Sequence, residues 1–153
     1  MRQTGMFLSR DNRWFVATSM AYLIASALWL AWQGTLIADP PLRIMGVHLF
    51  TAGFVLSLIY GLGAHMLPRF TGNPIAMGRL PWIQLGTLNS GLPLFLFGAA
   101  TGMRVAALAG GALIWLSFAV FAWRVWRVLW PRAAMHGISE DIDVRRADME
   151  VKR

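Results

Sequence analysis

The chain has 153 residues, of which 57% are hydrophobic and only 14% are charged. This composition is typical of an integral membrane protein and excludes an ordinary soluble domain. The absence of cysteine excludes disulfides, thiolate metal sites and cysteine nucleophiles. The formal net charge of +7 comes mainly from arginines beside apolar segments, which indicates membrane topology rather than nucleic-acid binding.

Four apolar segments are long enough to cross a bilayer, since a transmembrane helix needs about 20 apolar residues. In chain order they cover residues 14–32, 44–67, 81–101 and 105–129. The first is longer than the core of a secretory signal, so we expect a retained anchor. Residues 123–132 form a Trp- and Arg-rich collar, which is typical of a membrane interface. We therefore predict an all-α integral membrane four-helix bundle over residues 1–130, followed by a polar tail over 131–153.

The arginines between these segments predict the orientation of the bundle. Only Arg43 and Arg104 lie at one face of the membrane. The opposite face carries a larger set: Arg2, Arg10, Arg13, Arg69, Arg79, Arg124, Arg127 and Arg132. Because basic residues are enriched on the cytoplasmic side, both termini and the polar tail are expected in the cytoplasm.

The acidic residues all lie outside the predicted spans, which argues against a secondary transporter or a proton pump. They are Asp11, Asp39, Glu140, Asp141, Asp143, Asp148 and Glu150. The sequence also lacks a phosphate-binding loop, a Ser/His/Asp set and a nucleic-acid-binding pattern.

Two histidines, His48 and His65, flank the second apolar segment. They are 17 residues apart, which on a straight helix is about 25 Å, so they cannot share one ion. A stripe of small residues, which we call the small-residue stripe, lies on the helix face opposite His48 and predicts close helix packing: Gly46, Gly53, Ser57 and Ala64. His48 would then project away from that contact, beside Ala52, Val55 and Ile59, where its imidazole could ligate haem iron.

A simpler interpretation stays open for each candidate ligand. An intramembrane histidine can hydrogen-bond a hydroxyl or carbonyl of a neighbouring helix. His65 lies close to the headgroup region, and His136 falls in the polar tail. Met45, one turn from His48, and Met103, on the same side of the membrane, could approach a metal there, although methionine also fills gaps in cores.

The run HLFTAGFVLSLIYGLGAHMLPRFTGNP, residues 48–74, resembles the motif region of the NnrS family. In that family a His is followed by Gly-Phe five residues later, then by a small-residue helix and by Pro, Thr-Gly and Pro. The same order occurs here at His48, Gly53-Phe54, Pro68, Thr71-Gly72 and Pro74. The helix end at Pro68-Arg69 is also similar to a haem-copper oxidase helix that carries a copper-ligand His, which adds Arg69 to the candidate site residues.

The resemblance implies a multi-pass protein of the bacterial inner membrane that holds haem b and copper and is associated with nitric oxide stress in denitrifying bacteria. The family typically has a second His where Gly46 stands and often has Glu where Leu49 stands, and these differences remove copper ligands. The resemblance covers chiefly residues 44–80. The chain also lacks the adjacent His pair of an oxygen-reducing site.

We therefore expect a small haem b-binding membrane protein that uses His48, with a role in nitric oxide handling or electron transfer. The candidate site residues are His48, His65, Met45, Met103 and Arg69. A haem is wide for a bundle of this size, so a homo-oligomer or a larger membrane complex is expected. The alternatives are a cofactor-free scaffold or assembly subunit with structural histidines, and a quinol-linked nitric oxide reductase-like enzyme, which would need a second metal.

Overall fold

The computed structural model describes residues 9–33, 40–76 and 78–130, and this part of the chain is helical, without strands. α1 (Arg10–Gln33), α4 (Leu80–Thr101) and α5 (Arg104–Leu129) are α-helices. Between α1 and α4 the chain forms one rod from three consecutive segments: α2 (Pro40–His48), the π-helix η1 (Leu49–Val55) and α3 (Leu56–Thr71). The predicted all-α fold is confirmed for the described residues, whereas the predicted polar tail lies outside them.

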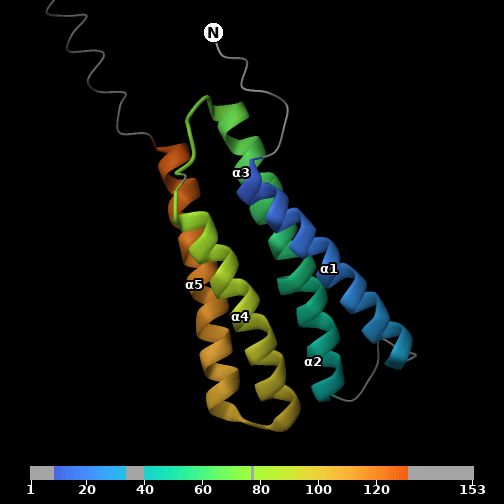
Figure 1. The fold of residues 1–153 in the computed structure, drawn as a ribbon. Helices are drawn as coiled ribbons and strands as arrows, with labels where there is room; N and C mark the ends of the chain where they lie inside the picture. Colours follow the sequence, from blue (N-terminus) through green and yellow to red (C-terminus); the bar gives the residue numbers. More distant parts are fainter. Residues whose placement is uncertain (1–8, 34–39, 77, 131–153) are drawn as a thin grey trace, which may run out of the picture.

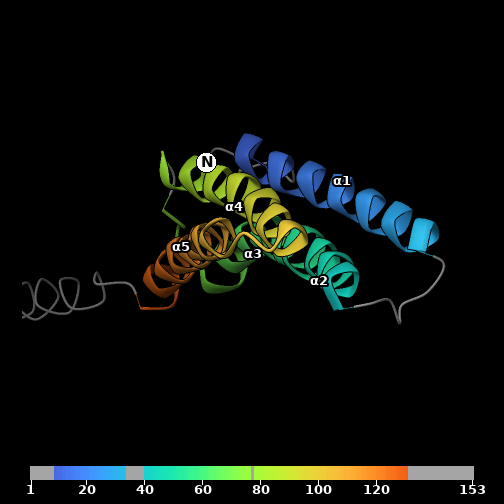
Figure 2. The ribbon, with the colours of Figure 1, turned by 90° about the horizontal axis from the view of Figure 1, so that it is seen from below.

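The four rods run antiparallel in chain order (Figure 1). The beginnings of α1 and α4 therefore lie at the same end of the molecule as the ends of α3 and α5. We call this the arginine-rich end, because six of the described arginines belong to the segments that meet there: Arg10, Arg13, Arg69, Arg79, Arg124 and Arg127. At the opposite end α1 diverges from α4 and α5, and α2 lies between them (Figures 1 and 2).

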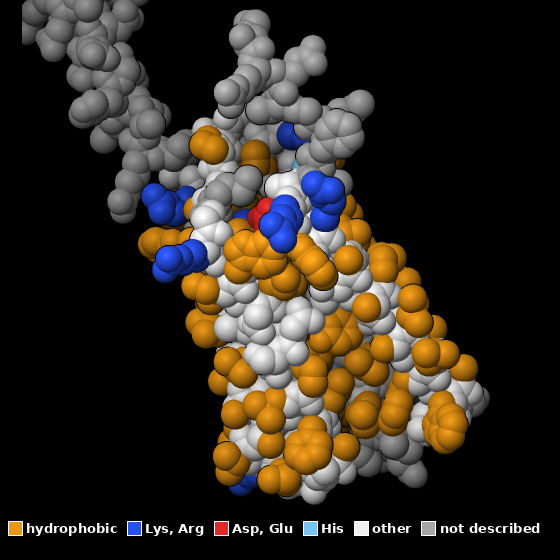
Figure 3. Space-filling view, viewed as in Figure 1, with side chains coloured by type: hydrophobic (Ala, Val, Ile, Leu, Met, Phe, Trp, Pro, Cys, Tyr) orange, Lys and Arg blue, Asp and Glu red, His pale blue; other side chains and the backbone are white. Residues whose placement is uncertain are grey.

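Three helical segments are long and apolar enough to cross a membrane: Arg10–Gln33, Arg43–Thr71 and Arg104–Leu129. α4 is not among them, because Gln84, Asn89 and neighbouring hydroxyl residues interrupt its apolar sequence. Figure 3 shows hydrophobic side chains along the length of the rods and basic side chains concentrated at the arginine-rich end. This distribution is the one expected for a protein whose sides face lipid.

α4 and α5 form a tight helical hairpin through glycines. A Cβ atom at Gly98 would overlap the backbone of Ala107, and one at Gly110 would overlap the backbone of Phe95. Gly91 is similarly close, since a Cβ there would lie 2.8 Å from Leu113 Cβ. Such close backbone approach is how apolar helices gain packing energy in lipid, where there is no hydrophobic drive between them.

The predicted small-residue stripe is confirmed as a packing surface, because all four of its residues are buried. A Cβ atom at Gly53 would lie 2.6 Å from Tyr22 Cγ, and one at Gly46 would lie 3.3 Å from Trp29 Cδ1. Both partners belong to α1. Part of the stripe is therefore used within the chain, to seat α1 against the rod of α2, η1 and α3.

The four rods meet in an aromatic core towards the arginine-rich end. Phe15 of α1 and Tyr60 of α3 are fully buried there, with their ring centroids 5.8 Å apart. Tyr60 also lies 4.7 Å from the ring of Phe121 on α5, and Leu88 of α4 completes the cluster. This core joins α1 and the rod of α2, η1 and α3 to the hairpin of α4 and α5. Polar residues lie beside it.

Candidate functional site

His48 is the last residue of α2 and directly precedes the π-helix η1. Its Nδ1 lies 2.8 Å from the carbonyl oxygen of Ile44, one turn earlier. A carbonyl can only accept a hydrogen bond, so this contact assigns the proton to Nδ1 and leaves the lone pair on Nε2. A histidine whose other ring nitrogen donates to a backbone carbonyl is in the state that binds metals.

A π-helix follows His48 directly. The expectation of Ala52, Val55 and Ile59 beside the imidazole was based on a regular α-helix, whereas the hydrogen bonds of η1 span five residues instead of four. The imidazole of His48 contacts the ring of Phe95 on α4, with 4.7 Å between the two ring centroids. Single-turn π segments occur frequently at functional sites, and this seven-residue π-helix begins directly after the candidate ligand.

The other predicted site residues are divided between the two ends of the bundle. His65 is half-buried on α3, and Arg69 is exposed in the last turn of that helix, at the arginine-rich end. Met45 is half-buried on α2, while Met103 is exposed between α4 and α5, at the opposite end of the bundle from Arg69 (Figure 1). Within residues 9–33, 40–76 and 78–130, no group of three or more His, Cys, Asp or Glu side chains could hold a metal ion. His48 and His65 therefore belong to separate places in the fold.

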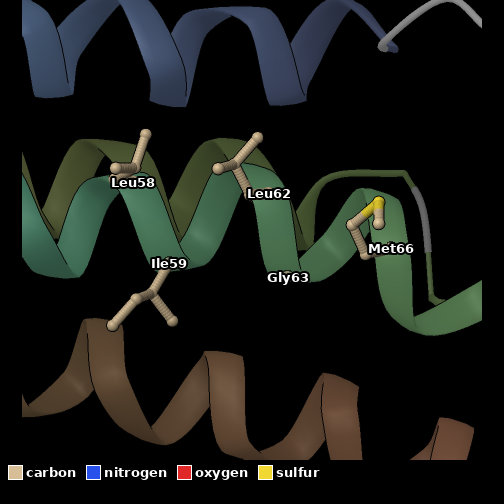
Figure 4. A pocket seen from close by; sticks show the side chains of 5 residues that line it. All are labelled: Leu58, Ile59, Leu62, Gly63 and Met66. Carbon is tan, nitrogen blue, oxygen red and sulfur yellow. The ribbon is translucent and has the colours of Figure 1, made fainter.

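A hollow of about 310 Å³ lies along α3 (Figure 4). Its lining is apolar and comes from Leu58, Ile59, Leu62, Gly63 and Met66. Leu58 and Leu62 point to one side of α3 and Ile59 to the other. Neither His48 nor His65 lines this hollow, and its five lining residues offer no side-chain ligand that iron commonly takes beyond the Met66 thioether.

A second polar site, which sequence reasoning missed, lies inside the arginine-rich end. Arg124 of α5 is fully buried, with 0% of its surface exposed. Its Nη1 donates a 2.7 Å hydrogen bond to Oε1 of Gln84 on α4, and its Nε donates one of 3.2 Å to the carbonyl oxygen of Ala76. The carboxylate of Asp11 on α1 attracts the guanidinium electrostatically.

Burial of two charged residues was not expected from the sequence. Arg124, within the Trp- and Arg-rich collar, is buried, although its neighbours Trp123, Trp126 and Arg127 are exposed. Asp11 precedes the predicted first span at 14–32 but lies in the first turn of α1, where its side chain is 8% exposed. A signal was present in the sequence: the buried residues of α5 recur at one-turn and two-turn spacing, namely Gly110, Ser117, Arg124 and Val128.

The buried polar cluster, which we define as Asp11, Asn12, Ser57, Tyr60, Gln84, Ser117 and Arg124, continues from Arg124 into the bundle. The Ser117 hydroxyl donates a 3.0 Å hydrogen bond to the backbone carbonyl of Gln84 and lies beside the Tyr60 hydroxyl. Further along the bundle, the Tyr22 hydroxyl donates a 3.2 Å hydrogen bond to Oδ1 of Asn89, joining α1 to α4. Polar side chains therefore connect the helices at two levels.

Comparison of the chain with protein-family models, with curated protein sequences and with solved structures finds no match.

Proposed function

We propose that this chain is a multi-pass membrane protein that binds haem b through His48 and acts in nitric oxide handling or electron transfer. The observation that carries the proposal is the 2.8 Å contact between His48 Nδ1 and the Ile44 carbonyl, which leaves Nε2 free to ligate iron. The resemblance of residues 48–74 to the NnrS motif supports the choice of haem and of nitric oxide.

Apolar side chains are exposed on the rod that carries His48. Val47 and Phe50, its neighbours at one and two residues in the sequence, are 50% and 43% exposed, so apolar surface is available for one face of a haem. A second wall must then come from another copy of the chain or from a larger membrane complex, so a homo-oligomer is part of the proposal.

Bound haem would supply reversible one-electron chemistry and an iron position for a diatomic gas. The chain's own residues would bind and orient it. His48 would provide the nitrogen that holds the iron, the Ile44 carbonyl would hold the ring in one tautomer and orientation, and Phe95 would limit rotation of the imidazole.

The same proposal includes α4 as a fourth membrane span and both termini in the cytoplasm of a bacterial cell. α4 is less apolar than the other helices, but its Gln84 and Asn89 side chains make hydrogen bonds inside the bundle. Polar side chains that are paired in this way can cross a bilayer. The larger number of arginines at the arginine-rich end supports a cytoplasmic location for that end.

The alternative function is a cofactor-free scaffold or assembly subunit. It is favoured by the fact that His48 has a partner for Nδ1 and a ring contact with Phe95 within the chain. The small-residue stripe gives it less support, because part of that stripe already packs against α1. An assembly surface would have to lie on another face.

The test is an absorption spectrum of the detergent-purified protein, oxidised and reduced, with a pyridine haemochrome count per chain. The expected result is a haem b spectrum that is lost in His48→Ala and retained in His65→Ala, a matched control on the same rod. A colourless protein that does not take up added haem would overturn the proposal and favour the scaffold. Equal loss of haem in both variants would reject the assignment to His48.

A further inference from the structure

The buried polar cluster contains several atoms without a hydrogen-bond partner in the protein. Two are donors, Arg124 Nη2 and Gln84 Nε2, and two are acceptors, Asp11 Oδ2 and Asn12 Oδ1. The Ser57 hydroxyl, which can donate or accept, is also unpartnered, and the Tyr60 hydroxyl has only Ser117 beside it. Gln84, Arg124, Ser57 and Tyr60 are 0% exposed, and Asn12 and Asp11 are 5% and 8% exposed.

These groups come from all four rods and lie at adjacent levels of the bundle. Arg124 and Gln84 are hydrogen-bonded to each other. The Asp11 carboxylate of α1 attracts the Arg124 guanidinium electrostatically. One turn deeper, Phe15 packs against Tyr60, whose hydroxyl lies beside Ser117. Ser117 in turn donates to the Gln84 backbone, so the deeper level is joined to the level of Arg124.

Leaving this many polar atoms unpartnered in a dry interior would be destabilising, because each buried group without a hydrogen bond loses its hydration and gains nothing in return. The mixture of hydrogen-bond donors and acceptors in the cluster determines which kind of ligand fits. An anion would meet the oxygens of Asp11 and Asn12, and a cation would meet the Arg124 guanidinium. Water can donate and accept at once, and buried waters typically make about three hydrogen bonds to such groups.

We propose that the buried polar cluster binds a group of internal water molecules that extends from the arginine-rich end to Tyr60. Entry from this end follows from Asp11, which is the second residue of α1 and lies between the exposed Arg10 and Arg13. Figure 3 shows the acidic side chain among basic ones at this end. The waters bridge Arg124 Nη2 and Gln84 Nε2 to Asp11 Oδ2 and Asn12 Oδ1.

This site is separate from the proposed haem ligand and does not depend on it. The waters hydrate the interior of the bundle at the arginine-rich end, around the buried side chains of Asp11 and Arg124. Tyr22 provides an internal comparison, since the chain has only two tyrosines and the Tyr22 hydroxyl is hydrogen-bonded to Asn89.

X-ray hydroxyl-radical footprinting of the full chain in lipid nanodiscs tests the proposal, because radicals formed from internal water label adjacent side chains. We expect several-fold faster labelling of Tyr60 than of Tyr22, although Tyr60 is fully buried. Labelling of Tyr60 that is no faster than that of Tyr22 would overturn the proposal.

Two variants locate the water that causes the labelling. Gln84→Leu removes a donor and an acceptor, and Asn12→Leu removes one unpartnered acceptor without breaking a hydrogen bond of the Arg124 side chain. Both should lower Tyr60 labelling towards the Tyr22 level. The control Ser90→Ala, on the exposed side of α4, should leave it unchanged, since Ser90 hydrogen-bonds only its own helix. If Gln84→Leu fails to fold, Asn12→Leu decides; Tyr60 labelling unchanged in the folded variants would refute the assignment.

Discussion

Arg124 Nη1 lies 2.7 Å from Gln84 Oε1, so a fully buried arginine of α5 is tied to a fully buried glutamine of α4. A guanidinium inside a bundle of apolar helices is costly unless its charge and its donors are satisfied. Asp11 supplies opposite charge from α1, and the Ala76 carbonyl accepts from Nε. This arrangement links three of the four rods at the arginine-rich end.

The hydrogen bond between Arg124 and Gln84 should contribute measurably to stability. Gln84→Met retains side-chain length and removes the acceptor, so we expect the free energy of unfolding to fall by about 1.5–3 kcal/mol, the range for hydrogen bonds to charged groups. Denaturant unfolding in detergent, followed by tryptophan fluorescence, measures this change. Thr87→Val is the control on the same helix, because the Thr87 hydroxyl bonds only its own helix. A loss no larger than that of the control would contradict the prediction.

Close packing of α4 on α5 should make Gly110 intolerant of a methyl group. Gly110→Ala places a Cβ atom into the backbone of Phe95, so the helices must separate, at a cost of about 1–3 kcal/mol or more. Gly86→Ala on α4 provides the matched control, since a Cβ there meets nothing within 4 Å. That substitution should stabilise the chain by about 0.5–1 kcal/mol through helix propensity. Thermal unfolding of both variants would reveal the opposite signs.

The hydrogen bond from Tyr22 to Asn89 should couple α1 to α4 modestly. A double-mutant cycle of Tyr22→Phe and Asn89→Leu should give a coupling free energy of about 0.6 kcal/mol, and no more than about 1.7 kcal/mol, as is found for interhelical hydrogen bonds in membranes. Unfolding in detergent by the same fluorescence assay provides the four values. Additive effects of the two substitutions would show that the 3.2 Å contact makes no net contribution.

If His48 ligates haem, Phe95 should act as a positioning residue. Phe95→Ala removes the ring that lies 4.7 Å from the imidazole, and we expect haem affinity to fall by about tenfold, the lower end for groups that orient a ligating histidine. Titration of the apoprotein with haem measures this affinity. Phe97→Ala, at an exposed position of the same helix, should bind haem as the parent chain does. Equal affinities in the two variants would exclude a positioning role for Phe95.

The periodicity of the sequence predicted the structure best where close packing of helices in lipid requires small residues. The small-residue stripe was predicted from residue spacing and is buried in the structure, because close helix approach in lipid requires small side chains. The π-helix itself was not predictable in the same way, since nothing in the residue pattern after His48 announces η1.

Composition and arginine placement by themselves determined that the chain is helical and has segments apolar enough to cross a membrane, because bilayer thickness and backbone hydrogen bonding leave few alternatives. The residue pattern also identified His48 as an unusual polar group. Only the tertiary structure decided which charged residues are interior. Arg124 and Asp11 lie near helix ends, where sequence alone predicts solvent or headgroups, and both are buried in the bundle, where Gln84 of α4 supplies a partner for Arg124. Burial of a charge depends on which helices surround it and which partners they bring, and neither is encoded in the local sequence.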